Sequence, residues 1–196
     1  MTNPTALAEP GHMTPQCEID FRFRDDRHGH VILIRLQNEV LEILESVEGT
    51  GADEWPPSPP LQQIHEQELP TGTVIWGLGM SGSAHWSGSF AVEEDGTSAT
   101  RRLHAELALR SSSQNAGPVS TYRVLDPNAT VVQPTEASLE VCSQFNQLLV
   151  NVDPERALLQ WFPEQRLLTI RPRVVPESAK VTLSWDYYLG PCPTRV

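Results

Sequence analysis

The stretch Cys-Glu-Ile-Asp-Phe-Arg-Phe-Arg at residues 17–24 decides the fold class, because apolar and charged side chains alternate along it. A period of two puts the apolar side chains on one face of a β-strand and the charges on the other. Turn-forming residues follow at 25–29, and then the continuous apolar run 31–34, which is typical of a strand covered on both faces. Together these segments predict a β-hairpin.

The rest of the chain extends this β pattern. Seventeen prolines in 196 residues argue against long helices. One short helix is expected at 39–48, where apolar residues recur at helical spacing between a capping Asn38 and Gly49. Residues 136–162 fit either helices or strands, and the proline-rich residues 55–60 predict a stiff connector. Further strands are expected at 73–79, 84–93, 101–110, 119–125, 166–171 and 179–189.

The fold class predicted from these segments is mainly β. We expect an antiparallel β-sandwich or jelly-roll-like single domain over residues 17–196, with eight to eleven strands and one to three short helices. Residues 1–16 are rich in proline and poor in apolar side chains, and predict a flexible tail.

Targeting features and cysteines bear on the compartment. Neither a secretory signal nor an apolar run long enough to span a membrane is visible. Three widely spaced cysteines, Cys17, Cys142 and Cys192, indicate neither a disulfide framework nor a zinc ribbon. A soluble cytoplasmic protein with reduced thiols is therefore expected.

The acidic residues are unevenly distributed. The net charge is −11, and residues 36–100 contain eleven acids but no Lys or Arg, which leaves fourteen acids against fourteen bases elsewhere. Such a block repels phosphate, so nucleic acid and anionic membranes are poor partners. It is compatible with a solvated acidic face, or with a face that binds cations or a basic protein surface.

One strand pair brings together residue types that are useful in catalysis. If Asp95-Gly96 forms a two-residue hairpin turn, His85 lies opposite Glu106 and Ser87 lies opposite His104 on the polar face. These four side chains, His85, Ser87, His104 and Glu106, are the candidate catalytic residues of an enzyme. A solvent-exposed sheet face also carries such residues without any catalytic role.

Histidines also suggest a metal site. His28 and His30 lie two residues apart, on one face of an extended chain, and His85 or His104 could complete a set of ligands for a divalent metal. The candidate ligands are therefore His28, His30, His85 and His104.

Two further patterns have weaker functional meaning. Gly77-Leu78-Gly79-Met80-Ser81-Gly82 matches a dinucleotide-binding fingerprint, but a strand rather than a helix follows it, so the glycines instead indicate a bulge or a close crossing of sheets. Five tryptophans would suit a carbohydrate-binding module if at least two were exposed side by side.

No catalytic motif is complete in this sequence. We therefore expect a non-enzymatic binding or interaction domain whose acidic face, residues 36–100, meets a basic protein surface, or which forms a homo-oligomer. No cofactor is favoured. The alternatives are a metal-assisted enzyme that uses the histidine cluster and a module that binds carbohydrate through exposed tryptophans.

Overall fold

The computed structural model describes residues 15–36, 39–53, 55–70, 72–94, 101–112, 117–144, 147–174 and 181–191, and these form fourteen β-strands and no helix. The tail predicted over 1–16 lies almost entirely outside these residues, although Gln16 already belongs to the first strand. The described part of the chain contains no helix that could cross a membrane. The strands are β1 (Gln16–Arg24), β2 (Arg27–Arg35), β3 (Val40–Ser46), β4 (Gln63–Leu69), β5 (Gly72–Ser81), β6 (Ala84–Glu94), β7 (Arg101–Ser111), β8 (Ser120–Val124), β9 (Thr130–Val132), β10 (Ser138–Cys142), β11 (Gln147–Val152), β12 (Ala157–Phe162), β13 (Leu167–Pro172) and β14 (Val181–Pro191).

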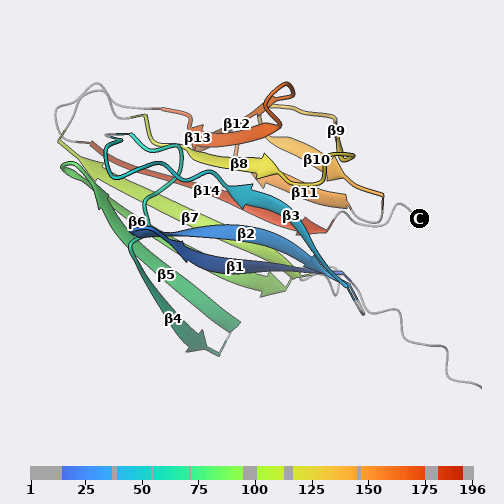
Figure 1. Ribbon diagram of the computed structural model, residues 1–196, viewed down its shortest axis with the longest axis horizontal. Coiled ribbons are helices and arrows are strands. Elements are labelled where there is room, and N and C mark those ends of the chain that lie inside the picture. Colours follow the sequence, from blue (N-terminus) through green and yellow to red (C-terminus); the bar gives the residue numbers. More distant parts are fainter. Residues whose placement is uncertain are drawn as a thin grey trace, which may run out of the picture.

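All fourteen strands belong to one mixed sheet that curls into a half-barrel (Figure 1). One path runs β12-β13-β8-β3-β2-β1-β7-β14-β11-β10-β9, and β6, β5 and β4 branch from β7. The joint between β1 and β7 is a single parallel pair, Gln16 with Arg101, whereas the other named strand pairs are antiparallel. The mainly β prediction is confirmed, but two separate sheets of a sandwich are not.

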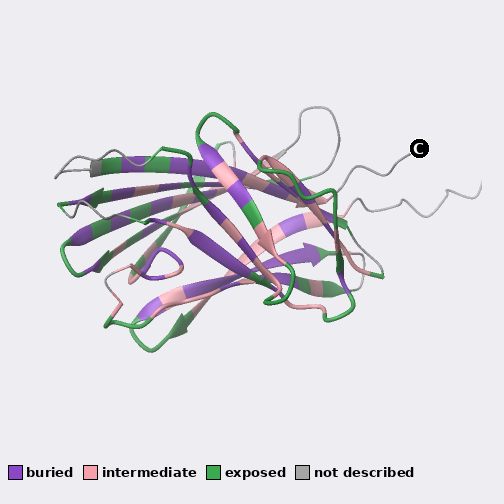
Figure 2. Cartoon of the chain, turned by 90° about the horizontal axis from the view of Figure 1, so that it is seen from above, coloured by how far each residue is buried: buried purple, intermediate pink, exposed green. Residues whose placement is uncertain are grey.

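The curled sheet has two arms that meet at the β1–β7 joint: one runs from β1 to β12, and the other contains β7, β14, β11, β10 and β9 with the branch β6-β5-β4. The core lies between these arms, and buried residues alternate with exposed ones along the strands (Figure 2). Phe21 on β1 packs edge to face on Phe90 of β6, with ring centroids 5.2 Å apart. Deeper in, the hydroxyl of Tyr122 on β8 lies 2.5 Å from that of Tyr187 on β14. Contacts of this kind hold the arms together by burying apolar surface from both.

The β1–β2 hairpin predicted from residues 17–34 is confirmed. Arg24 pairs with Arg27, so Asp25 and Asp26 form the turn, and Asp25 takes the left-handed conformation that a short polar side chain tolerates. Val31 and Leu33 are buried on the side opposite the core. The strand is therefore covered on both faces, as its continuous apolar run predicts.

The helix predicted at 39–48 is wrong, because these residues contain strand β3. Ile32 pairs with Leu44 but Leu33 pairs with Glu42, so Ile43 is an extra residue in a β-bulge. The bulge buries Ile43 and Leu44 consecutively. It interrupts the alternation of the strand, so its apolar residues recur at a spacing that resembles one face of a helix. The ambiguous segment 136–162 likewise forms strands in its described part, β10, β11 and β12.

The proline-rich connector ends by crossing the inner face of β5. A Cβ on Gly77 would lie 2.9 Å from a methyl carbon of Leu61, and one on Gly79 would overlap the backbone of Pro60. These glycines therefore permit a close crossing, one of the two roles expected for them. The crossing packs the end of the connector against the β4–β5 hairpin, which projects at the bottom of Figure 1 and is joined to the rest of the sheet through the β5–β6 ladder.

Candidate functional site

The strand pair β6–β7 has a different register from the predicted one. His85 pairs with Arg110 and Ser89 with Glu106, so the prediction that His85 faces Glu106 is wrong. The last pair is Glu94 with Arg101, and six residues, rather than two, connect the strands. The shift is an even number of residues. Trp86 therefore still shares the buried face with its partner Leu109.

This register separates the candidate catalytic residues. His104 pairs with Ala91, six residues along the ladder from His85, which corresponds to about 20 Å along the strands. Ser87 pairs with Ala108 rather than with His104. The four side chains share the outer face of the sheet but do not converge on one point.

The four candidate metal ligands are also dispersed. His30 is buried in the core, where its Nε2 lies 2.7 Å from the hydroxyl of Tyr122. His28 packs against Phe23 on the same face, whereas His85 and His104 lie on the outer face of the β6–β7 pair. The described residues contain no group of three or more His, Cys, Asp or Glu side chains placed to hold a metal ion.

His104 belongs to a charged network of its own. Its Nδ1 lies 3.2 Å from a carboxylate oxygen of Glu93, and its Nε2 lies 3.7 Å from one of Asp186. The ring stacks on Tyr188, with centroids 4.3 Å apart. Arg156, which follows β11, lies 3.1 Å from the buried carboxylate of Asp186. The network links β6, β7, β14 and the β11–β12 connection.

A general base needs a pocket in which a substrate can reach it. Neither His104 nor Asp186 lines the two cavities described below. Glu93 of the network does line one of these cavities, so the network meets a cavity only through that carboxylate.

Several described acids of residues 36–100 are paired or buried. Arg22 of β1 reaches across β2 to Glu42 of β3, at 2.5 Å, and Arg24 pairs with Glu45 at 3.0 Å. Glu48 is largely buried, and burial raises the pKa of its carboxyl to about 7.

Two acids of this block, Glu66 and Glu68 on β4, are exposed. Neither has a cationic partner within 4.0 Å among the described residues. The free acidic charge on described strands is thus found at the β4–β5 hairpin.

The outer face of β5 exposes three large apolar side chains in alternate positions. Trp76, Leu78 and Met80 are 45%, 54% and 47% exposed, and we call them the apolar stripe. Trp86 and Trp185 are instead buried in the core, so the exposed large apolar side chains include a single tryptophan. The pair of exposed rings expected for a carbohydrate-binding module does not occur among the described residues.

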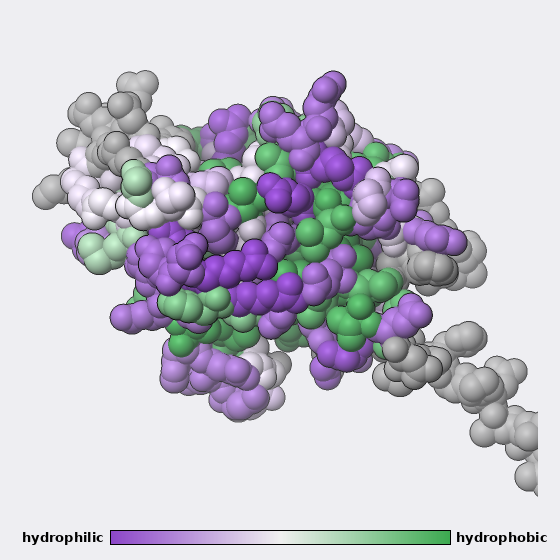
Figure 3. Space-filling model, viewed as in Figure 1, coloured by the Kyte–Doolittle hydropathy of each residue, from purple (hydrophilic) through white to green (hydrophobic). Residues whose placement is uncertain are grey.

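A shallow cavity of about 460 Å³ adjoins the apolar stripe. Leu78, Met80 and His85 line one part of it, and Ala108 and Arg110 of β7 line another. The space-filling view shows apolar and polar side chains intermingled on the face that it presents (Figure 3). The lining of this cavity therefore offers both apolar side chains and polar groups that can form hydrogen bonds beside the stripe.

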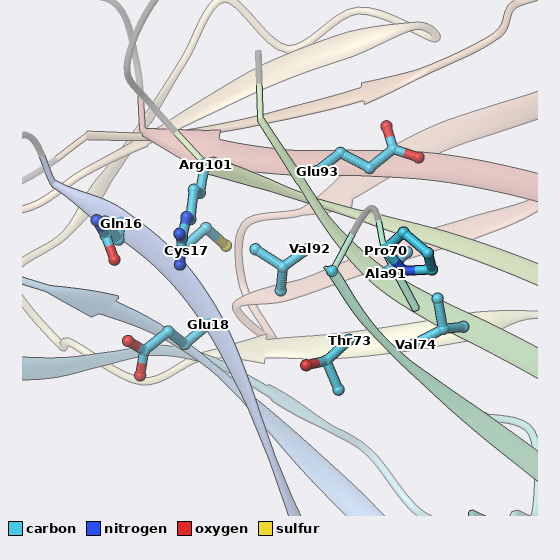
Figure 4. Close-up of a pocket in the computed structure, with 11 residues that line it drawn as sticks. Gln16, Cys17, Glu18, Pro70, Thr73, Val74, Ala91, Val92, Glu93 and Arg101 are labelled. Atoms are coloured by element: carbon cyan, nitrogen blue, oxygen red, sulfur yellow. The ribbon is translucent and has the colours of Figure 1, made fainter. Parts of the chain in front are cut away.

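A second, larger cavity of about 1070 Å³ opens between β1 and the β5–β6 pair (Figure 4). Cys17 and Val92 point into it from opposite sides, and Glu18, Glu93 and Arg101 lie around it. Burial raises the pKa of the Cys17 thiol to about 12. The thiol therefore stays protonated at neutral pH and is a poor nucleophile.

The apolar stripe was not predicted from the sequence. Residues 74–80 place apolar side chains at Val74, Trp76, Leu78 and Met80, while Ile75 and two glycines alternate with them. Trp76, Leu78 and Met80 share one face of the strand, opposite Gly77 and Gly79. This pattern could have identified the stripe, because glycines on one face of a strand mark the close approach of another chain segment.

Comparison with known proteins gives no assignment: the chain matches no protein-family model, and no curated protein is significantly similar to it.

Proposed function

We propose that this protein is a cytoplasmic, non-enzymatic binding domain that holds a basic protein surface at the β4–β5 hairpin. The apolar stripe is the main support. Three neighbouring large apolar side chains, each about half exposed, leave contiguous apolar surface in water. Tryptophan and methionine are enriched in protein interfaces, where a few such side chains supply most of the binding energy.

The charge near the stripe supports a basic partner. Glu66 and Glu68 lie on the strand next to the stripe, and no cation of the described residues neutralises them. A partner with lysine or arginine at matching positions would gain complementary charge, and the attraction would speed its association. Glu42 and Glu45 are already paired within the sheet and contribute less to such a surface.

The scaffold suits a binding role. We regard the two facing arms as a sandwich-like or jelly-roll-like support, and the close crossing at Gly79 as the attachment that fixes the hairpin to it. Cys17 is a buried free thiol, which is compatible with the reducing cytoplasm.

Site-specific photocrosslinking in the producing cell tests this function. A photoreactive phenylalanine analogue replaces Leu78 in one variant and Val174, another exposed apolar residue far along the chain, in the control. We expect a defined protein adduct from position 78 and none from position 174. Leu78→Ser should weaken capture of the same partner at least about tenfold, while Val174→Ser should leave it unchanged.

Two results would count against the proposal. Equal adducts from both positions would mean that the hairpin is not the binding surface. A partner whose capture survives Leu78→Ser would show that the apolar stripe does not hold it.

A further inference from the structure

Strand β4 has a free edge. Over Gln63–Leu69 it pairs with β5 and with no other described strand. The preceding residue Leu61 is bridged to β2, where the amide of His28 donates to its carbonyl at 2.7 Å. The edge beyond Leu61 therefore presents amide and carbonyl groups that another strand can pair with.

One face of this edge strand is acidic. Glu66 and Glu68 are two residues apart, so both lie on the inner face of β4, and both are exposed. Glu68 accepts a hydrogen bond from the Thr73 hydroxyl at 2.9 Å, and neither carboxylate has a described cation nearby. A strand added here would be stabilised by basic side chains on the same face.

The opposite face of β4 leads to the apolar stripe. The indole nitrogen of Trp76 donates to the side-chain oxygen of Gln67 on β4 at 3.3 Å. This bond directs the nitrogen side of the ring across β4, towards the free edge. The added strand would lie two strands from β5, about 9–10 Å away. Apolar side chains on its outer face would approach the ring because the ring extends across β4.

A second copy of this chain is a poor occupant of the edge. Antiparallel pairing of β4 with itself about residue 66 would place Glu66 opposite the same carboxylate of the other copy. Pairing centred on residue 67 would place Glu66 opposite Glu68, and pairing about residue 65 would make the two Glu66 side chains diagonal neighbours. Like charges at these positions destabilise a sheet, so the edge favours a different, basic chain.

We infer that an extended segment of the partner adds to β4 as a new strand, with alternating basic and apolar side chains. Its Lys or Arg side chains face Glu66 and Glu68, and its apolar side chains face Trp76. Main-chain hydrogen bonds would contribute much of the affinity, and the alternation would set the register. This inference rests on the proposed function and specifies the partner's chemistry.

Synthetic peptides provide the test. The probe is a monomeric peptide of about eight residues, similar in length to β4, that alternates lysine with valine and is titrated into isotope-labelled full-length protein. One control peptide has glutamate in place of lysine. A second keeps the sequence but carries N-methyl groups on alternate amides, so that one edge cannot donate hydrogen bonds.

We expect the lysine peptide to bind with amide shifts confined mainly to residues 63–69 and their β5 partners. N-methylation should weaken binding at least about tenfold, as the loss of several main-chain hydrogen bonds requires. The double variant Glu66→Gln/Glu68→Gln should weaken it about fivefold at low salt. A matched double variant, Glu155→Gln/Glu164→Gln, changes two exposed acids elsewhere and should have no effect.

Equal binding of the plain and N-methylated peptides would overturn strand addition, because charge alone would then explain the affinity. Equal binding by the Glu66→Gln/Glu68→Gln variant would overturn the assigned charge contacts. Absence of peptide binding, with Leu78-dependent capture of the partner intact, would overturn strand addition while leaving the proposed binding function in place.

Discussion

The backbone of Pro60 crosses Gly79 so closely that a Cβ on this glycine would overlap the Pro60 carbonyl oxygen and lie 2.7 Å from its carbonyl carbon. The obstacle is backbone, which cannot turn aside as the end of a flexible side chain can. Gly79 is therefore required by the crossing, and through the crossing by the position of the β4–β5 hairpin.

Gly79→Ala should destabilise the protein by about 3 kcal/mol or more, since one of two backbones must move to relieve the overlap. The free energy of unfolding in urea measures this loss. Gly117→Ala is the control, because a Cβ there has no atom within 4 Å, and its unfolding free energy should stay within about 0.5 kcal/mol of the wild type. Equal stability of the two variants would contradict the close crossing.

The sequence was most informative where a strand keeps strict alternation. Residues 17–24 alternate without interruption and form β1 as predicted. Strand β3 was mistaken for a helix because the bulge at Ile43 breaks its period of two, and a bulge depends on how β2 pairs with it. Strand β4 was not predicted, since an exposed edge strand such as Gln63–Leu69 needs few apolar side chains.

For the candidate site, the sequence predicted which side chains share a face of the β6–β7 pair, but not which residues lie opposite each other. Alternation correctly put His85 and His104 on the outer face, opposite Trp86. Which residues lie side by side depends on the number of residues in the β6–β7 connection, and Asp95-Gly96 resembles a tight turn whatever follows it. The ion pair of Glu42 with Arg22 joins residues that are twenty positions apart in the chain, so no local pattern indicates it.

Arg22 should stabilise the outer side of β2 in two ways. Its guanidinium pairs with Asp20 at 2.9 Å and Glu42 at 2.5 Å. Val31 lies between Gly29, the β2 partner of Arg22, and Leu33, the β2 partner of Glu42, so we expect the Arg22 stem to cover it. Arg22→Ala should lower the unfolding free energy by about 1 kcal/mol. Arg22→Met keeps an apolar stem and should lose less. If both variants lose the same amount, the stem contributes nothing.

Glu48 should make stability depend on pH. Burial raises its pKa from 4.5 to about 7 in the folded protein, despite the opposing hydrogen bond from Ser46 and the charge of Arg27. The folded state therefore binds more protons than the unfolded state between these values. This contribution to stability is complete below about pH 4.5 and is lost as the pH rises through 7.

Glu48→Gln removes this titration. Relative to the wild type, the variant should gain roughly 2–3 kcal/mol in unfolding free energy between pH 4.5 and 8. Urea unfolding at several pH values measures the difference. A difference that does not vary over this range would show that the Glu48 pKa is not raised in the folded protein.

Tyr122 should matter more than Tyr187 in the buried polar chain. The Tyr122 hydroxyl lies 2.7 Å from Nε2 of His30 and 2.5 Å from the Tyr187 hydroxyl, so Tyr122→Phe removes the hydrogen-bond partner of a buried imidazole. We expect a loss of about 2–3 kcal/mol for Tyr122→Phe and about 1 kcal/mol for Tyr187→Phe. Thermal or urea unfolding distinguishes them, and the reverse order would contradict this arrangement.

The proposed binding surface can be located most directly by hydrogen exchange of the full-length protein, alone and with the partner identified by crosslinking at Leu78. We predict slower exchange in β4 and β5, residues 63–69 and 72–81, with no change in β12 and β13, residues 157–162 and 167–172. Protection of β12 and β13, or of the strands around His104, with β4 and β5 unchanged, would contradict a binding site on the β4–β5 hairpin.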